Sequence, residues 1–285
     1  MKTLLNKKNV GYLFILPWLI GFLVFTIVPI LYSFFLSFND VIITATGIET
    51  TFTALENFRR VITEDIEFIR QAGTFFMEAF ISVPLIVVLA LIMSLLLNAK
   101  VRARGLFRTI FFLPVIINSG PVLNKLIDLE LTTIPALRNY EFYQILASNS
   151  GFFIVDLLLF ALNNFVIFLW LAGVQILIFL AALQKVDLQI YEAARIDGAS
   201  TWEIFWRITL PSLLPMILVN IVYTTVMYSA SALNQVTTHI SANMFRIDTG
   251  FGYTSALSWI YFVVVTVVLL LLAGIFMIFQ KKSLR

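Results

Sequence analysis

Several classes of protein are excluded by what the 285-residue chain lacks. It contains no cysteine, so neither a disulfide framework nor a cysteine-ligated metal site is possible. His239 is the only histidine, which argues against a histidine-based metal or catalytic site, and we expect it to lie alone at the surface. No glycine begins a GxxxxGK[ST] phosphate loop, so we do not expect this chain to hydrolyse ATP.

Charged residues are also scarce. They make up 12% of the chain, against about 25% in soluble domains, whereas apolar residues make up 60%. The net charge of +3 is too small to indicate a nucleic-acid partner. This composition predicts an integral membrane protein with lipid as its main surroundings.

Long apolar runs predict one all-α membrane domain over residues 1–285, with about six transmembrane helices. A membrane-crossing helix needs about 20 apolar residues. The predicted spans are about 11–38, 73–98, 109–129, 151–183, 210–233 and 256–279. The fourth run is longer than a bilayer requires, so we expect it to tilt or protrude. Between the spans we expect one short surface helix within 52–68 and a loop over 234–253.

The distribution of basic residues predicts the orientation of the spans. Cytoplasmic segments of membrane proteins carry an excess of Lys and Arg. With both termini inside, the cytoplasmic segments hold about two thirds of the bases, including a basic cluster at Lys100, Arg102, Arg104 and Arg108. The polar stretch between spans four and five then faces the cytoplasm as well.

That stretch, residues 187–215, predicts two short helices with a break between them. Asp187 can cap a helix over Leu188–Ile196, and Gly198 can stop it in a left-handed conformation. Ser200 followed three residues later by Glu203 forms a capping box for the second helix. Pro211 disfavours helical geometry at the residue before it, so we expect a bend or boundary at Leu210.

These residues resemble a known signature. Glu192-Ala193-Ala194, Gly198 and Ile208-x-Leu210-Pro211 are spaced like the EAA motif of the membrane subunits of binding-protein-dependent ABC importers. Asp197, Ala199, Phe205 and Pro215 also fit the version of carbohydrate and glycerol-phosphate permeases. Residues 12–17 and 28–38 resemble the MalF-like half of such permease pairs.

The resemblance implies an assembly and a site. In this family the EAA helices dock on a cytoplasmic ATPase, which carries the ATP and Mg²⁺, so this chain needs no cofactor of its own. The docking residues would be Glu192, Ala193, Ala194, Asp197, Gly198 and Ala199. The other implied partners are a second, different permease subunit and an extracellular solute-binding protein that delivers a sugar or oligosaccharide. The localisation implied is the bacterial plasma membrane, crossed several times.

Three other functions are compatible with parts of this pattern to different degrees. The solute could be a non-sugar such as glycerol phosphate. A self-sufficient secondary transporter would predict paired discontinuous helices or central ionisable groups, and we find neither. A DNA-reading helix-turn-helix is disfavoured because residues 185–207 hold more acids than bases.

Polar residues on spans four and five are candidates for the solute path. Steps of three or four residues place Asn220, Thr224, Tyr228, Ser231 and Gln235 on one helical face. Asn164, Leu171 and Gln175 share a face of span four. We expect Thr224 and Tyr228 near the middle of their span. The alternative is that these groups only bond neighbouring helices. Two acids within apolar runs, Glu78 and Asp156, are expected near the membrane interface rather than in a proton relay.

Overall fold

The computed structural model describes residues 10–44, 47–98, 105, 125, 140–231, 234–246 and 249–283. It divides into two compact units, each considered by itself. The first comprises Met1–Ala72 and Thr238–Val263, and the second comprises Gly73–Thr237 and Val264–Arg285. The predicted third span (109–129) and the basic cluster at 100–108 lie outside the described residues, apart from Gly105 and Lys125.

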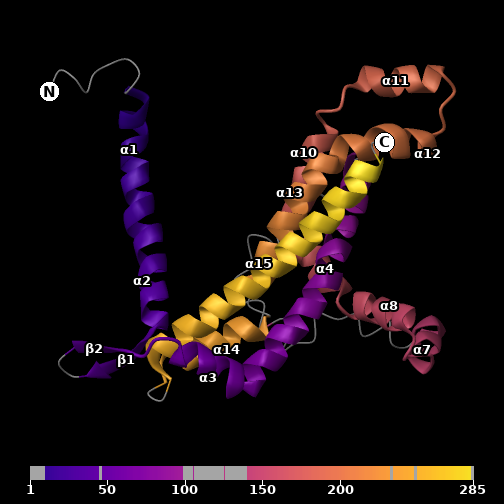
Figure 1. Cartoon of the computed structure of the whole chain (residues 1–285). Helices are drawn as coiled ribbons and strands as arrows, with labels where there is room; N and C mark the ends of the chain where they lie inside the picture. Colours follow the sequence, from indigo (N-terminus) through magenta and orange to yellow (C-terminus); the bar gives the residue numbers. More distant parts are fainter. Residues whose placement is uncertain are drawn as a thin grey trace. The chain divides into compact units, whose positions relative to one another are not determined.

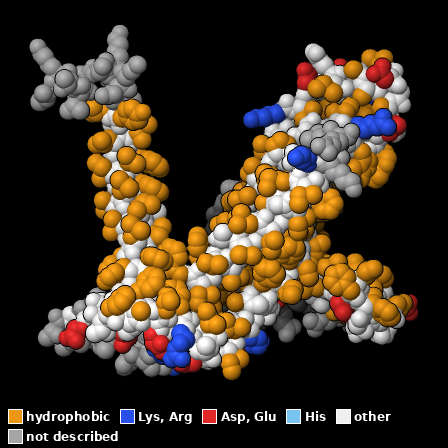
Figure 2. Space-filling view, viewed as in Figure 1, with side chains coloured by type: hydrophobic (Ala, Val, Ile, Leu, Met, Phe, Trp, Pro, Cys, Tyr) orange, Lys and Arg blue, Asp and Glu red, His pale blue; other side chains and the backbone are white. Residues whose placement is uncertain are grey.

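The first unit begins with one continuous apolar helical run. It consists of α1 (Val10–Phe22), a π-helical turn η2 (Leu23–Ile27) and α2 (Val28–Ser37) (Figure 1). Large apolar side chains on this run are exposed, as the orange surface of α1 and α2 in Figure 2 shows. A helix that is apolar on every side needs lipid or another protein around it, which suits the predicted first span.

A small β-hairpin follows, an element that the sequence analysis did not predict. Strands β1 (Asn39–Thr44) and β2 (Gly47–Phe52) pair antiparallel, with Asn39 opposite Phe52. The next element, α3 (Glu56–Thr63), is the short helix expected within 52–68. Its buried Asn57 donates from Nδ2 to the carbonyl oxygens of Ser37 and Asn39, at 3.1 and 3.0 Å, and so ties α3 to the end of α2.

A cluster of hydrogen bonds around the Asp65 carboxylate links segments of this unit that lie far apart in the sequence. Asp65 precedes α4 (Ile66–Asn98) and accepts through Oδ2 from Tyr253 Oη (2.7 Å) and from His239 Nε2 (2.9 Å). Its Oδ1 accepts from the backbone N–H of Phe68 at 2.9 Å. His239 lies on α14 (Gln235–Met244) and Tyr253 on α15 (Gly250–Ser283). His239 is therefore not the solitary surface residue that we expected, because it pairs with a carboxylate far away in the sequence.

This cluster makes the stability of the unit depend on pH. Burial opposes ionisation of Asp65, but the hydrogen bonds from Phe68, Tyr253 and His239 outweigh it and hold the pKa of that carboxyl below its ordinary value. A depressed pKa stabilises the fold above the unfolded-state value of about 3.9, and this stabilisation disappears as the pH falls through the folded-state pKa.

We therefore expect Asp65→Asn to lower the thermal midpoint of the detergent-purified protein at pH 5–7. The expected loss is about 1–3 kcal/mol, the usual cost of losing hydrogen bonds to a charged group. The gap between the wild type and Asp65→Asn should shrink below about pH 4. Measuring the same difference in a His239→Gln background separates the contribution of the Asp65 carboxylate from that of the His239 imidazole. A gap that stays constant down to pH 3 would contradict this assignment.

In the second unit, the apolar run 151–183 is not one tilted helix. It forms α8 (Phe153–Asn163), α9 (Phe165–Leu171) and α10 (Gly173–Leu183), after a short α7 (Glu141–Ser148). A 62° bend separates α8 from α9. Asn164 causes this break because its backbone leaves the helical region (φ −100°, ψ 6°) and its Nδ2 donates to Phe160 O at 2.9 Å.

The polar stretch runs directly into the next apolar helix. After α11 (Leu188–Ile196), the chain forms α12 (Thr201–Ile204), the π-helical turn η4 (Phe205–Thr209) and α13 (Leu210–Ser229). The boundary expected at Leu210 is confirmed, because η4 ends at Thr209 and α13 begins at Leu210, although Leu210 itself keeps helical angles (φ −62°, ψ −46°). The wider η4 turn directly precedes Leu210 and Pro211, at the point where the missing proline N–H would interrupt an α-helix.

Two further boundaries differ from the expectation. Helix α13 ends at Ser229 rather than at 233, and α14 occupies part of the predicted loop 234–253. Within the described residues, four helices are long and apolar enough to cross a membrane, or up to six if each of two bent pairs counts as one span. The core of the second unit lies where α10 packs on α13, with Ile176, Phe179 and Leu213 fully buried.

Candidate functional site

The polar stretch folds into the two capped helices that its sequence predicts. Asp187 accepts at its side chain from the backbone N–H of Gln189 at 2.9 Å, which confirms the first cap. Gly198 has φ +83°, the left-handed conformation expected of it. The backbone N–H of Ala199 donates to Ala194 O (2.9 Å) and that of Gly198 to Arg195 O (3.1 Å). These two bonds are the pattern of a Schellman turn.

The second helix starts with the predicted capping box. The backbone N–H of Glu203 donates to Ser200 Oγ at 3.3 Å, and the backbone N–H of Ser200 donates to Glu203 Oε2 at 2.9 Å. The hydroxyls of Tyr191 and Thr209 bond each other at 3.2 Å and tie α11 to η4. The turn at Gly198 thus ends α11, and the capping box starts α12, so both ends of the connection between the two helices are hydrogen-bonded.

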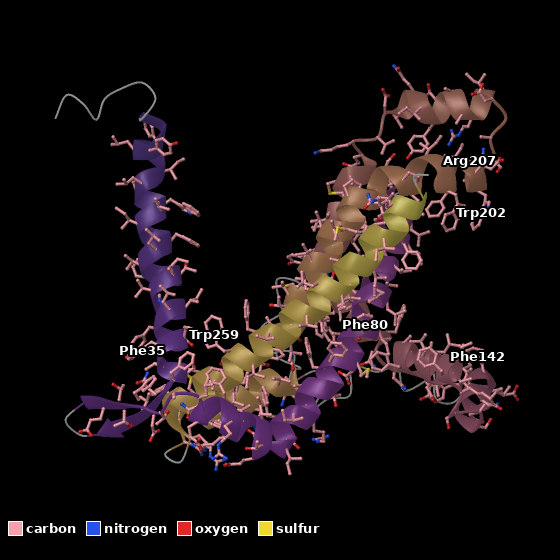
Figure 3. All side chains as sticks on the ribbon, viewed as in Figure 1. Phe35, Phe80, Phe142, Trp202, Arg207 and Trp259 are labelled. Atoms are coloured by element: carbon pink, nitrogen blue, oxygen red, sulfur yellow. The ribbon has the colours of Figure 1, made fainter. Side chains whose placement is uncertain are left out.

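The helix α11 presents a mixed surface to its surroundings. Of the predicted docking residues, Glu192, Ala193, Asp197 and Gly198 are exposed, and Ala194 and Ala199 are half-buried. Leu188 and Ile196 are also exposed, at 73% and 87%. Figure 1 shows α11 as a separate short helix near α12, and Figure 3 labels Trp202 of α12 and Arg207 of η4. Exposed apolar side chains therefore lie at both ends of α11.

Two of the solute-path candidates, Gln175 of α10 and Thr224 of α13, are hydrogen-bonded to each other. Gln175 Nε2 donates to Thr224 Oγ1 at 3.0 Å, and both side chains are at most 1% exposed. Asn220, one turn before Thr224, is also fully buried, and neither atom of its amide has a partner among the described residues. The Gln175–Thr224 bond is what packing between helices predicts, whereas the Asn220 amide lacks a partner among the described residues. None of the three side chains lies at an open surface.

The other path candidates do not share one face. Asn164 sits at the bend between α8 and α9, whereas Leu171 is buried within α9. Because α13 ends at Ser229, Ser231 lies beyond the helix and Gln235 begins α14. The predicted helical stripe therefore covers only Asn220, Thr224 and Tyr228.

Tyr228 belongs to a different group, which the sequence did not reveal. It lies in the last turn of α13, not near the middle of the span. Its Oη donates to Glu78 Oε2 at 3.4 Å and accepts from Ser82 Oγ at 3.3 Å, both on α4. The ring of Phe75 stacks on the Tyr228 ring at 6.0 Å between centroids. No local pattern could have paired residues about 150 positions apart.

The second acid in an apolar run has a local role. Asp156 accepts at Oδ1 from the backbone N–H of Gly151 at 3.2 Å, in the turn that leads into α8. Its carboxylate therefore stabilises the start of a helix, where negative charge is favourable.

Comparison with known proteins decides the family. Residues 67–284 match the family described as the binding-protein-dependent transport system inner membrane component, and the match covers most of the chain. The chain belongs to this family. It is therefore the multi-pass membrane component of an ABC-type transport system, as the EAA-like segment indicated.

Two relatives show how far the similarity extends. The probable ABC transporter permease protein YesP of Bacillus subtilis is 28% identical over 94% of this chain and 91% of its own length. The trehalose/maltose transport system permease protein MalF of Thermococcus litoralis is 31% identical over 78% of this chain and 74% of its own length. Both alignments include most of each permease.

A solved structure shares the fold. It is a chain of a bacterial alginate ABC transporter, crystallised in complex with an alginate pentasaccharide-bound periplasmic protein. The similarity has a TM-score of 0.59 and covers 93% of both chains, at 21% identity. At this identity the comparison shows a shared fold.

Proposed function

We propose that this chain is one of two different permease subunits of an ATP-driven importer, and that its solute is an uncharged sugar or oligosaccharide. The observation that carries the proposal is the capped pair α11–α12, whose Schellman turn and capping box present the EAA-like residues at the surface. A self-sufficient transporter would have no use for such a docking surface.

ATP and Mg²⁺ then belong to a separate cytoplasmic ATPase that binds α11. The exposed Leu188 and Ile196 would enter a groove of that partner, while Ala193 and Ala194 allow close approach. Glu192 would make a charge-assisted hydrogen bond to a basic residue of the ATPase. The remaining partners are a second permease subunit and an extracellular solute-binding protein.

The relatives support a sugar as the solute. Besides the trehalose/maltose permease, the similar proteins include permeases named for arabinooligosaccharides and for lactose. Hydroxyl-rich solutes suit sites made of amides, hydroxyls and tyrosine rings, and among these groups on α13 the half-buried Tyr228 reaches a surface.

The test is co-purification followed by an ATPase assay. A tagged version of this chain should retain a second permease and an ATPase, and the complex with its binding protein should hydrolyse ATP faster when a neutral oligosaccharide is added. A panel of maltotriose, arabinotriose, lactose and glycerol 3-phosphate separates a sugar permease from a glycerol-phosphate permease. Purification of this chain alone, without any ATPase, would contradict the proposal.

For the orientation, we expect both termini and the basic cluster at 100–108 to be cytoplasmic. The chain has no native cysteine, so single replacements report unambiguously. Leu5→Cys, Arg104→Cys and Ser283→Cys should resist a membrane-impermeant maleimide in intact cells and react after permeabilisation. Ser150→Cys, on the opposite side, should react at once. Ready labelling at position 104 would overturn this topology.

A further inference from the structure

Three aromatic rings form an exposed cluster where the EAA-like segment joins the helix α13. Trp202 of α12 is 69% exposed and Trp206 of η4 is 49% exposed. Their rings meet edge to face at 5.4 Å between centroids, and the ring of Phe205 meets that of Trp206 at 5.1 Å. Neither indole N–H donates a hydrogen bond to a residue that the structure describes. An exposed patch of this kind marks a surface for a protein or a membrane.

The cluster lies at the end of a membrane span. The helix from Thr201 to Ser229 is apolar enough to cross a membrane, and its 29 residues exceed the roughly 20 that a bilayer requires. Its only charged residues, Glu203 and Arg207, lie near its start, so residues 208–229 carry no charge and suffice to cross the hydrocarbon. Residues 201–207 therefore lie at the level of the lipid headgroups, where tryptophan is enriched.

The cluster faces away from the helix that is expected to bind a partner protein. Figure 3 shows the Trp202 side chain on the side of α12 opposite to α11. A protein bound to α11 and a membrane in contact with the aromatic cluster would therefore occupy different sides of the α11–α12 pair. This arrangement favours lipid as the occupant of the aromatic surface.

The charges near the two helices are separated in the same way. Glu203 is the one acid of α12, and its carboxylate already accepts hydrogen bonds from the backbone N–H and the hydroxyl of Ser200. Arg207 of η4 is exposed and forms no salt bridge with a described residue. The side chain beside the tryptophans that is open to a charged ligand is thus a cation. The other acids of the segment belong to α11 and its two caps: Asp187, Glu192 and Asp197.

We propose that α12 and η4 form a lipid-contact surface made of Trp202, Phe205, Trp206 and Arg207. Arg207 binds the phosphate of a phospholipid headgroup, because its guanidinium can donate two parallel hydrogen bonds to phosphate oxygens. The aromatic rings lie just below the phosphates, and the indole N–H groups donate to lipid ester carbonyl oxygens.

This contact fixes the EAA-like segment relative to the bilayer. The hydroxyls of Tyr191 and Thr209 bond each other at 3.2 Å and tie α11 to the end of η4. A lipid held by η4 therefore also limits how far α11 can move toward or away from the membrane. The inference goes beyond the proposed function, since it concerns the membrane and holds whichever protein binds α11.

The experiment uses the full-length chain in nanodiscs of phosphatidylcholine that is brominated either near the headgroup or near the chain end. Trp18, Trp170 and Trp259 are replaced by phenylalanine, so that only Trp202 and Trp206 emit. Bromine near the headgroup should quench most of this emission, and bromine near the chain end much less. Iodide in the water should quench weakly. If the triple variant does not fold, the difference between the wild type and a Trp202→Phe, Trp206→Phe double variant gives the same signal.

The phosphate contact is tested with brominated phosphatidylglycerol diluted into unbrominated phosphatidylcholine. Arg207→Gln should raise the mole fraction of phosphatidylglycerol for half-maximal quenching about fivefold, the effect of one basic residue at an anionic membrane surface. Arg195→Gln is the matched control, because it removes the exposed basic residue of α11 and should leave the mole fraction unchanged. An Arg207→Gln variant that behaves like Arg195→Gln would overturn the phosphate contact.

Two outcomes would overturn the lipid-contact surface as a whole. Strong quenching by iodide with weak quenching by either brominated lipid would place the tryptophans in water. Loss of lipid quenching when the ATPase binds would show that the same rings contact the partner protein. The nanodisc measurements need no ATPase, so they test this surface even if the proposed function fails.

Discussion

Replacing Gly198 with valine should weaken retention of the cytoplasmic ATPase about 5- to 30-fold while the subunit still inserts into the membrane. Gly198 adopts φ +83°, and a left-handed conformation costs an L-residue roughly 1–2 kcal/mol. A Cβ at this position would meet nothing within 4 Å, so the penalty is conformational and not steric. The capped turn would then be populated less, and the apparent affinity for the ATPase falls with that population.

A graded series makes this prediction specific. Gly198→Ala should have a smaller effect than Gly198→Val, because alanine lacks the β-branch. The matched control is Gly73→Val, since Gly73 also has open space around its Cβ but lies within the helix α4. Retention is measured by pull-down of the ATPase at increasing salt and by ATP turnover of the complex. If Gly198→Val binds the ATPase as tightly as Gly73→Val does, the turn plays no part in docking.

The local fold of the EAA-like segment 187–215 was predictable because its determinants are local. A cap, a glycine stop and a capping box each depend on residues within a few positions of one another. The structure shows these features at Asp187, Gly198 and Ser200. The exposure of Leu188 and Ile196 could not be read from the same pattern, because apolar residues on a short helix could equally pack against the protein.

Features that depend on tertiary contacts could not be predicted. An apolar run of 33 positions gives no hint of where an asparagine will break it, yet the chain bends by 62° at Asn164. The pairing of Asp65 with His239 joins residues 174 positions apart, and that of Glu78 with Tyr228 joins residues 150 positions apart. The polar stripe predicted on span five is wrong from Ser231 onward, because the helical spacing was extended past Ser229, where α13 ends.

A gain in stability is expected from replacing Asn220. Both atoms of its fully buried amide lack a partner within the described part of the chain. A buried polar group without a hydrogen bond costs about 1–3 kcal/mol. Asn220→Leu removes that cost at similar volume, so it should raise the thermal midpoint of the purified subunit by several degrees, at about 2–4 °C per kcal/mol. If a sugar uses the amide during transport, its uptake should fall even as stability rises.

A second variant, one helical turn away, should lower the thermal midpoint instead of raising it. Thr224→Val keeps the shape of its residue but removes the acceptor of Gln175 Nε2, which would leave a buried donor unpaired. Its midpoint should therefore fall by a similar number of degrees. Thr225→Val serves as the control, because the Thr225 hydroxyl bonds only to Ile221 O of its own helix. Midpoints are measured by scanning fluorimetry in detergent, and uptake is measured in proteoliposomes of the assembled transporter. A lower midpoint for Asn220→Leu would show that the folded subunit already bonds this amide, and it would assign Asn220 to helix packing.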